Sequence, residues 1–414
     1  MKFRLLFFCM ISASAARADD KLTLARVLKD VGEQHPQVRA AQALAAADRE
    51  RIPQASAWDD PTVGIEHMRR DNLRILRADE TEFSVSQKLP VTSQRRQRVA
   101  LAKAEAAVAD SRVSAQVTPL VIQATDAFYR LVRARELLEL TRSNDEILAR
   151  ALSAVQARLA SGATDVTSVL LAETERARLQ EPVIALEREI AEATTMLNTL
   201  RNLPPESAIG ALDASVGPAA GNIGTFESLR DRALAYRPEL RAADAQVTAA
   251  DRATDVARAW LPDPEVTVRA RHIRGTNSPI SEYDTGLAIS LPWINRGKYQ
   301  ASVREAQRRR DAAELDVALL RSRTVAELRD AWTRHESAMR SVTLYHDRLL
   351  PLAERSLGAA STGLDSGKSG ILELVSAQKN LREVRNALAD AQSERARALA
   401  VIGAMTGQNF FTLP

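Results

Sequence analysis

The chain carries one sequence pattern twice, about 200 residues apart, and this duplication constrains its fold more than any other feature. The segment His35–Ala41 (HPQVRAA) returns as Arg237–Ala243 (RPELRAA), and Asp60-Pro61 returns as Asp263-Pro264. Solenoid repeats are only roughly 20 to 50 residues long, so a repeat of this length is one larger structural unit used twice. We therefore expect two halves of similar architecture.

The first 18 residues have the pattern of a secretory signal peptide. Lys2 and Arg4 precede an apolar run, and small residues end at Ala18, where we expect cleavage. The only cysteine, Cys9, lies within this segment, so the mature chain offers no thiol for a disulfide, a metal or catalysis. The chain has 57 Lys and Arg against 53 Asp and Glu. Part of the small excess belongs to the signal, so charge gives no reason to expect a nucleic-acid partner.

Long helices are predicted for most of the remainder, because apolar residues recur at helical spacing and glycines are few. Residues 93–160 and 295–362 each form such a stretch. About seventy helical residues span roughly 100 Å, which suits a tube or coiled bundle better than a compact globule. Pro119, Pro182 and Pro351 lie inside the periodic stretches and are expected to kink or interrupt them.

Short strands are predicted between the helices of each half. Phe83 and Val85 alternate with serines, and apolar residues alternate with polar or small ones from Tyr283 to Leu291. Residues 265–271 set valines against arginines, a pattern that places water on one face and apolar surroundings on the other. No apolar run is long enough for a membrane helix, so membrane insertion would use these strands. An amphipathic sheet resting on helices in a soluble protein fits the alternation equally well.

These patterns predict the following organisation: a signal peptide at 1–18, a first repeat at 19–202 with a hairpin near 62–89 and long helices at 93–200, an irregular connector at 203–225, a second repeat at 226–405 with a hairpin near 265–291 and long helices at 295–405, and a tail at 406–414.

Signal peptide, duplicated hairpins and long helices meeting at Ser-Gly turns together resemble the TolC family of outer-membrane efflux proteins, over essentially the whole mature chain. The resemblance implies a mainly α fold with a small membrane β part. Duplicated long helices would form a trimeric α-barrel, and each protomer would add four strands to a shared 12-stranded β-barrel. It also implies a location in the outer membrane of a Gram-negative bacterium, with a large periplasmic part.

Family motifs fall at the helical turns. The segment Arg158–Gly162 resembles the Arg-Leu-x-x-Gly motif with which the tube end meets a periplasmic adaptor, so the resemblance assigns Arg158, Leu159 and Gly162 to adaptor contact. In the second half Leu364 and Gly367 match, whereas Gly363 stands where the arginine would be. The alternative is that both glycines only supply the left-handed conformation that ends a helix.

The segment after the second turn resembles the family's acidic periplasmic aperture. Glu373 falls on one of its acidic positions, and Ser376 departs from the other. Three copies of Glu373 around an axis would favour cations. A solvated glutamate that complements the helix dipole is the simpler interpretation.

Enzymatic chemistry has no recognisable motif here. The five histidines show no paired metal-ligand spacing, and no phosphate-binding glycine loop or nucleophile elbow occurs. We therefore predict a non-enzyme without cofactor or resident metal. The family resemblance implies these partners: two further copies of the chain, outer-membrane lipid, a periplasmic adaptor (membrane fusion protein) and an inner-membrane pump of the resistance-nodulation-division type.

The substrate depends on a weaker resemblance. The strand end Gln87–Pro90, followed by Arg95, Arg96 and Arg98, is similar to the heavy-metal-cation branch of the family, typified by cobalt-zinc-cadmium and copper-silver systems. Drug efflux and type I secretion by the same fold remain open. Two other classes are a periplasmic adaptor and a soluble coiled-coil scaffold, although an adaptor would need a compact β-rich region that these four strands do not provide.

Overall fold

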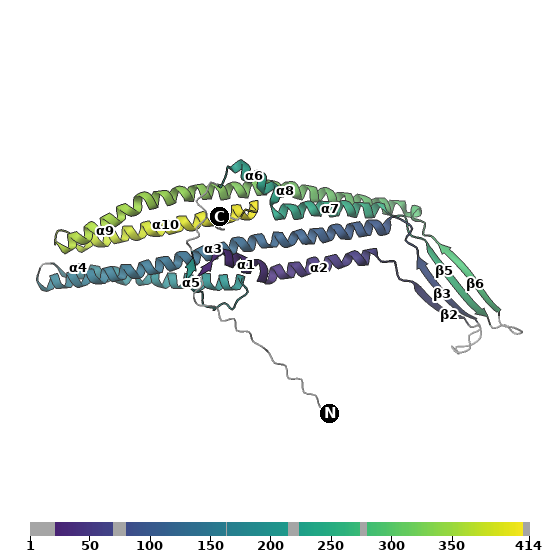
Figure 1. The fold of residues 1–414 in the computed structure, drawn as a ribbon, viewed down its shortest axis with the longest axis horizontal. Helices are drawn as coiled ribbons and strands as arrows, with labels where there is room; N and C mark the ends of the chain where they lie inside the picture. Colours follow the sequence, from purple (N-terminus) through teal and green to yellow (C-terminus); the bar gives the residue numbers. More distant parts are fainter. Residues whose placement is uncertain (1–20, 69–79, 163, 214–222, 274–279, 409–414) are drawn as a thin grey trace, which may run out of the picture.

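The computed structural model describes residues 21–68, 80–162, 164–213, 223–273 and 280–408. The signal segment, part of the connector and most of the C-terminal tail lie outside these residues. Long helices lie side by side along the molecule, and a small sheet projects from one end (Figure 1). The expectation of a mainly helical fold with a small β part is confirmed.

Both halves follow the same order: two short helices, a hairpin, and long helices. The first half contains α1 (Leu24–Gln34), α2 (Pro36–Ser56), β2 (Thr62–Met68), β3 (Glu80–Lys88), α3 (Gln94–Ala160), α4 (Val166–Arg178) and α5 (Gln180–Leu200). The second contains α6 (Phe226–Tyr236), α7 (Pro238–Arg258), β5 (Glu265–Ile273), β6 (Ile280–Ala288), α8 (Arg296–Leu344), α9 (Leu350–Asp365) and α10 (Ile371–Thr406). Short parallel strands β1 (Leu22–Thr23) and β4 (Leu212–Asp213) pair near the middle of the molecule.

The short helices begin and end where local chemistry requires. A residue before proline is disfavoured in the helical conformation, so α1 ends before Pro36 and α6 ends before Pro238. His35 also caps α2, since its Nδ1 accepts a hydrogen bond from the Gln37 amide at 3.2 Å.

The prolines of the long stretches act differently from one another. Pro119 was expected to kink or interrupt its helix, and the structure shows no interruption, because the 67-residue helix α3 continues through it. Pro119 is exposed while Thr118 and Leu120 beside it are buried, so packing on both sides holds the helix together. Pro182 is the third residue of α5, three residues after the turn residue Leu179 that ends α4, and Pro351 is the second residue of α9, directly after a π-helical turn, η2 (Tyr345–Leu349). In both cases the regular α-helix is interrupted just before the proline.

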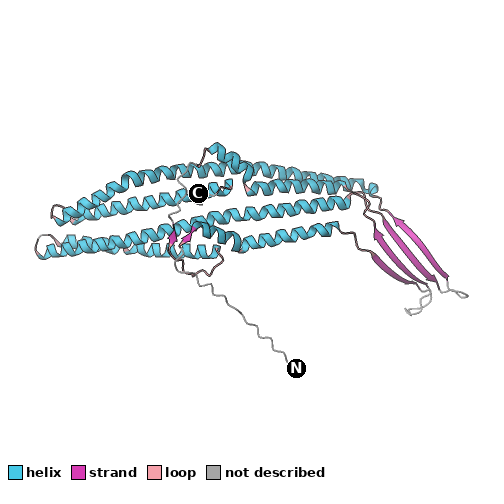
Figure 2. Ribbon diagram, viewed as in Figure 1, coloured by secondary structure: helices cyan, strands magenta, loops and turns pink. Residues whose placement is uncertain are grey.

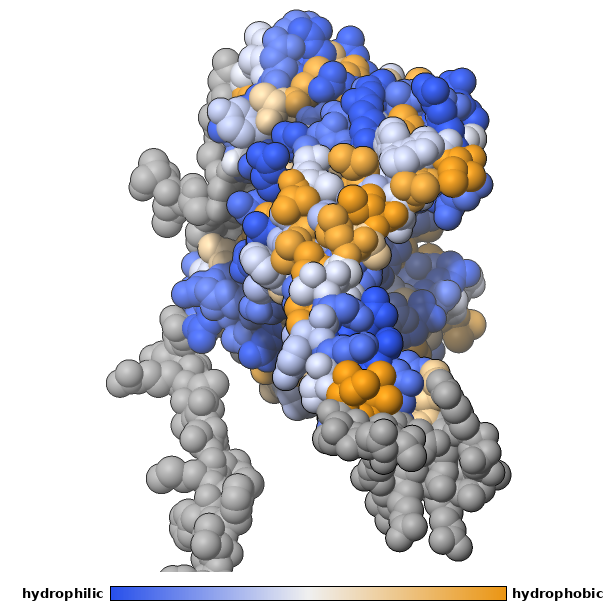
Figure 3. All heavy atoms as spheres, turned by 90° about the vertical axis from the view of Figure 1, so that its right-hand side faces the viewer, coloured by the Kyte–Doolittle hydropathy of each residue, from blue (hydrophilic) through white to orange (hydrophobic). Residues whose placement is uncertain are grey.

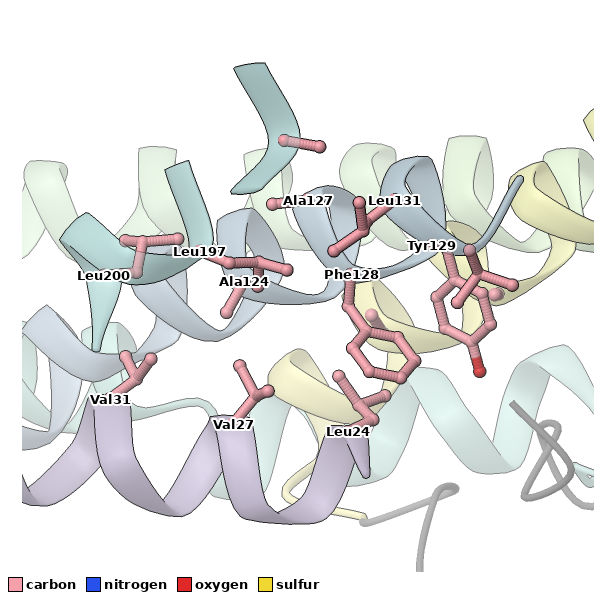
Figure 4. Close-up of a cluster of buried hydrophobic side chains, with 14 of the residues drawn as sticks. Leu24, Val27, Val31, Ala124, Ala127, Phe128, Tyr129, Leu131, Leu197 and Leu200 are labelled. Carbon is pink, nitrogen blue, oxygen red and sulfur yellow. The ribbon is translucent and has the colours of Figure 1, made fainter. Parts of the chain in front are cut away.

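The main core lies where α1 and α5 pack against the middle of α3 (Figure 4). Phe128 and Leu131 of α3 and Leu197 of α5 are almost fully buried there, with Val27 and Val31 of α1 closing the cluster. Alanines such as Ala124 let the helix backbones approach closely. This cluster fixes the short helices to the long ones midway between the sheet and the helical turns.

Candidate membrane and partner interfaces

The sheet is built from the hairpins of both repeats. Its strand order is β2-β3-β5-β6, all antiparallel, so that β3 of the first half pairs with β5 of the second (Figure 2). Two further contacts join the halves beside this pairing: the Leu89 amide donates to the Pro264 carbonyl at 2.9 Å, and the Thr92 amide donates to the Asp263 carboxylate at 2.8 Å. The two repeats therefore present one continuous surface.

One face of the sheet is apolar. Residues directly opposite one another in the register share a face, so side chains form rows across the strands. The two central rows are Val63–Val85–Val268–Thr285 and Ile65–Phe83–Ala270–Tyr283. Val63, Phe83 and Tyr283 are 69%, 51% and 81% exposed, because nothing in the described part of the chain covers them. Large apolar side chains left uncovered in neighbouring rows mark a surface that meets lipid or a partner.

The opposite face is polar and charged. Arg271 lies 2.9 Å from both Glu80 and Glu82, and Arg269 lies 3.2 Å from Asp284. These pairs cross two of the three strand contacts, β3–β5 and β5–β6, and leave the charges partly exposed. A sheet with lipid-compatible side chains on one face and ion pairs on the other has the alternation of an outer-membrane barrel wall.

The sheet has two open edges. Neither β2 nor β6 pairs with another strand on its outer side in the described part of the chain. Unpaired backbone groups of an edge strand are not tolerated in a lipid environment. If the apolar face meets lipid, other copies of the sheet must satisfy these edges.

None of the described helices combines the length and the hydropathy required to cross a membrane. Within the described ranges, no group of three or more His, Cys, Asp or Glu side chains is arranged to hold a metal ion.

The first tip, defined as the turn between α3 and α4, lies at the end of the molecule opposite the sheet (Figure 1). Gly162 has φ +72°, and its amide donates to the Leu159 carbonyl at 3.0 Å, so the glycine closes the helix in the left-handed conformation. Asp165 then caps α4 by accepting from the Ser168 amide at 3.0 Å. The Ser168 hydroxyl also donates to the Asp165 carboxylate at 2.7 Å, and this bond, together with the amide bond, lowers the pKa of the Asp165 carboxyl.

The second tip, between α9 and α10, repeats this geometry. Gly367 has φ +71°, and its amide donates to the Leu364 carbonyl at 3.1 Å. A Cβ on Gly363 would meet the Ser369 hydroxyl oxygen, so an arginine at this position would require the Ser369 side chain to move.

The two tips contact each other. The Arg158 guanidinium donates a hydrogen bond to the Leu364 carbonyl across the gap between the repeats. Leu364 is only 4% exposed and packs with Val155 of α3 and Leu374 of α10, while Leu159 lies at the edge of the same cluster. The family motif assigns Leu364 to adaptor contact, but its side chain is already buried within the protomer.

Glu373 lies exposed in the first turn of α10. A Cβ on Gly370, the cap residue of that helix, would lie 3.0 Å from the Glu373 carboxylate, so the side chain reaches back over the helix start. A carboxylate there complements the positive end of the helix dipole. The position of Glu373 is consistent with a solvated glutamate that complements the helix dipole, and its carboxylate lies in solvent at the second tip.

Three exposed apolar residues at the tips were not among the site residues predicted from the sequence. Val166 and Leu170 lie one turn apart on α4 and are 58% and 56% exposed, and Leu372 on α10 is 59% exposed. Their i and i+4 spacing on α4 could have indicated an apolar stripe beside the Ser-Gly turn. They add an uncovered apolar surface to the motif residues.

The amphipathic sheet, the long helices and the paired tips define the class of outer-membrane channel protomers built from an α-helical tube and a β-sheet. A model of the family described as "Outer membrane efflux protein" matches residues 27–202 and 229–408. The chain belongs to this family.

Comparison with known proteins gives the same result. The chain is 27% identical over 273 residues to the cobalt-zinc-cadmium resistance protein CzcC of Cupriavidus metallidurans, covering 64% of this chain and 62% of that protein. It is 22% identical over 306 residues to the outer membrane protein TolC of Vibrio cholerae, covering 70% and 68%. The solved structure of the outer-membrane channel OprN superposes with a TM-score of 0.76 at 19% identity, over 94% of this chain and 91% of that one. The match to CzcC thus spans about three fifths of that relative.

Proposed function

We propose that the chain is one subunit of a passive exit duct in the outer membrane, in which three copies close one β-barrel and one periplasmic helical tube. The observation that carries this proposal is the sheet: apolar side chains on one face, ion pairs on the other, and an open edge on each side. Four strands cannot close a barrel, whereas three copies give twelve, an even number of the kind bacterial barrels use.

A concave helical surface supports the tube. A cavity of about 640 Å³ is lined by Asp48 of α2, Glu105 of α3, Gln246 of α7 and Arg309 of α8. Helices α2, α3, α7 and α8 pack in this order, so one cavity can reach all four only on the inner side of a curved layer. Three such layers would enclose a lumen with charged walls.

We place the adaptor at the tips and the pump beyond it. Arg158, Leu159, Gly162 and Gly367 lie at the end of the tube away from the sheet, where a periplasmic adaptor (membrane fusion protein) would dock. Exposed Val166, Leu170 and Leu372 extend this surface. Transport energy would come from an inner-membrane pump of the resistance-nodulation-division type, and Glu373 would line the aperture.

We propose heavy-metal cations as the cargo. Support comes from the likeness to CzcC, a cobalt-zinc-cadmium resistance protein, and from the resemblance at Gln87–Pro90. Arg95 of the same segment donates to the Ser56 carbonyl at 2.9 Å, so this arginine has a local structural role at the end of α2. The likeness to TolC covers a slightly larger share of the chain and keeps drug efflux or type I secretion as the second candidate.

Two experiments test these proposals separately. Fractionation of the producing cell should recover the mature chain in the outer membrane, and recovery in the soluble periplasm would reject the duct. Growth of a deletion strain on zinc, cobalt, cadmium, copper and silver salts, beside dyes and antibiotics, tests the cargo. Sensitivity confined to metals supports metal efflux, whereas sensitivity to drugs alone rejects it and leaves the duct intact.

A further inference from the structure

A groove lies where the chain leaves the sheet and begins its second long helix. This junction groove has a volume of about 310 Å³ and lies between the segment just after α7, the 3₁₀ turn η1 (Pro292–Asn295) and the first three turns of α8. Its lining combines the aromatic side chains of Trp260, Trp293 and Tyr299 with the guanidinium groups of Arg296 and Arg304. The Trp260 and Tyr299 rings are 5.8 Å apart and form one wall.

The junction groove opens away from the concave side of the helical layer. Its residues on α8, Arg296, Gln300 and Arg304, recur every four positions and so share one helix face. Ser302, Glu305 and Arg309 of the same helix line the large concave cavity, which places that cavity on a different face of α8. The groove therefore faces the surroundings of the duct instead of its interior.

The groove continues the apolar face of the sheet. Leu287, Ile289 and Leu291 follow one another along β6 and its extension at every second position, and they are 67%, 52% and 49% exposed. The run leads directly into Trp293, which is 54% exposed. Viewed from the sheet end, apolar side chains gather in patches among hydrophilic ones (Figure 3). Tryptophan at the end of a lipid-facing strand is typical of the level of the lipid headgroups.

Its charge sets the groove apart from the other cavities. Acidic side chains line the concave cavity and two further cavities along the tube, whereas none of the residues lining the junction groove is acidic. Neither Arg296 nor Arg304 has an ion-pair partner among the described residues. Lys298 adds a further cation beside Tyr299, 5.8 Å from the ring centre. The groove is thus an apolar slot with uncompensated positive charge.

The first repeat lacks this site. At the equivalent positions, Val91 stands for Trp293 and Gln94 stands for Arg296. The nearby Arg95 is engaged by the Ser56 carbonyl. The groove is therefore a particular feature of the second repeat and does not follow from the duplication.

We propose that the junction groove binds the headgroup of an anionic phospholipid in the periplasmic leaflet of the outer membrane. The phosphate accepts hydrogen bonds from Arg296 and Arg304, and the glycerol and upper acyl chain lie against Trp260, Trp293 and Tyr299. Each protomer would then hold one lipid at the level where barrel becomes tube. The inference rests on the proposed placement of the sheet in the outer membrane.

Native mass spectrometry of the protein extracted in mild detergent tests the proposal. The complex is titrated with phosphatidylglycerol or phosphatidylcholine, and phosphatidylglycerol should bind more tightly. The double variant Arg296→Ala/Arg304→Ala should bind phosphatidylglycerol about thirty-fold more weakly, as expected for two basic contacts to an anionic headgroup. The matched control, Arg308→Ala/Arg309→Ala, removes the same charge from exposed positions outside the groove and should change binding less than about twofold. Equal affinity for both lipids, or equal losses in both variants, would overturn the proposal.

Photo-crosslinking identifies the occupant directly. With p-benzoylphenylalanine in place of Gln300, irradiation in native membranes should give an adduct with the mass of one phospholipid. A covalent dimer of the chain would show that a second copy fills the groove, and would refute lipid binding. If the protein sits in the outer membrane but shows no selective lipid, only this inference fails. Recovery from the soluble periplasm would remove the proposed function as well.

Discussion

A single charge on the apolar face of the sheet distinguishes a lipid-facing wall from a sheet in a soluble protein. Val268 lies on the inner strand β5, between Val85 and Thr285 in the register, and is 50% exposed. Its neighbour Thr267 points to the opposite, polar face, in line with Ser86 and Gly286. Val268→Arg and Thr267→Arg therefore add the same charge one residue apart, on opposite faces.

The magnitude follows from the cost of a cation in lipid. An arginine near the bilayer midplane of a barrel costs about 2 to 4 kcal/mol, so three copies cost about 6 to 12 kcal/mol if the sites act independently. Such a penalty is comparable with the whole stability of a typical protein domain. We expect Val268→Arg to abolish assembly, whereas Thr267→Arg, which stays in water, should assemble normally.

The assay is recovery of the chain in carbonate-washed outer membranes, together with its migration as an oligomer without heating. The wild type and Thr267→Arg should appear in this fraction, and Val268→Arg should be degraded or found in aggregates. Equal recovery of the two variants would refute the assignment of the apolar face to lipid. It would favour the soluble scaffold, in which both positions are merely exposed.

Three further predictions concern the core and the tips. Phe128→Ala should lower the free energy of unfolding by about 3 to 5 kcal/mol, because the ring is 1% exposed, whereas Leu44→Ala, which removes a side chain that is 68% exposed, should change it by less than about 0.5 kcal/mol in denaturant titrations. Arg158→Ala should remove the bond to the Leu364 carbonyl and cost about 1 to 2 kcal/mol locally, seen as faster amide exchange at the second tip; unchanged exchange would mean that the contact adds no stability. Hydrogen bonds from Ser168 lower the pKa of the Asp165 carboxyl. The cap therefore stabilises α4 fully at pH values above the ordinary aspartate pKa, and this stabilisation is lost as the pH falls through the lowered pKa. Asp165→Asn should flatten the acid dependence of amide exchange in the first turn of α4, and an unaltered pH profile would show that another group causes it.

The sequence was most informative where the periodicity of apolar residues and the positions of prolines indicated the same elements. Alternation around Phe83 and Tyr283 predicted the two strand faces, and the structure places these residues in one apolar row. Duplication predicted the repeated order of elements. Pro36 and Pro238 mark the breaks between the short helices in both repeats, because the residue before a proline avoids the helical conformation.

Features that depend on contacts between the repeats could not be read in this way. The pairing of β3 with β5 joins segments about 185 residues apart, and no local pattern encodes that register. Burial of Leu364 results from α3 and α10 packing around it, so its motif position suggested an exposed contact. Pro119 was expected to kink or interrupt its helix, but α3 continues through it, with buried neighbours on both sides that hold the helix together. The Arg158 contact with Leu364 likewise exists only after the two tips come together.

The central claim is that several copies of this chain close one barrel in the outer membrane. Its most direct test is the mass of the complex extracted from that membrane in mild detergent, measured by native mass spectrometry. The account predicts a mass of three mature chains, with Val268→Arg absent from the preparation. A complex of one chain would contradict it, since the open edges of β2 and β6 would then have no partner in lipid.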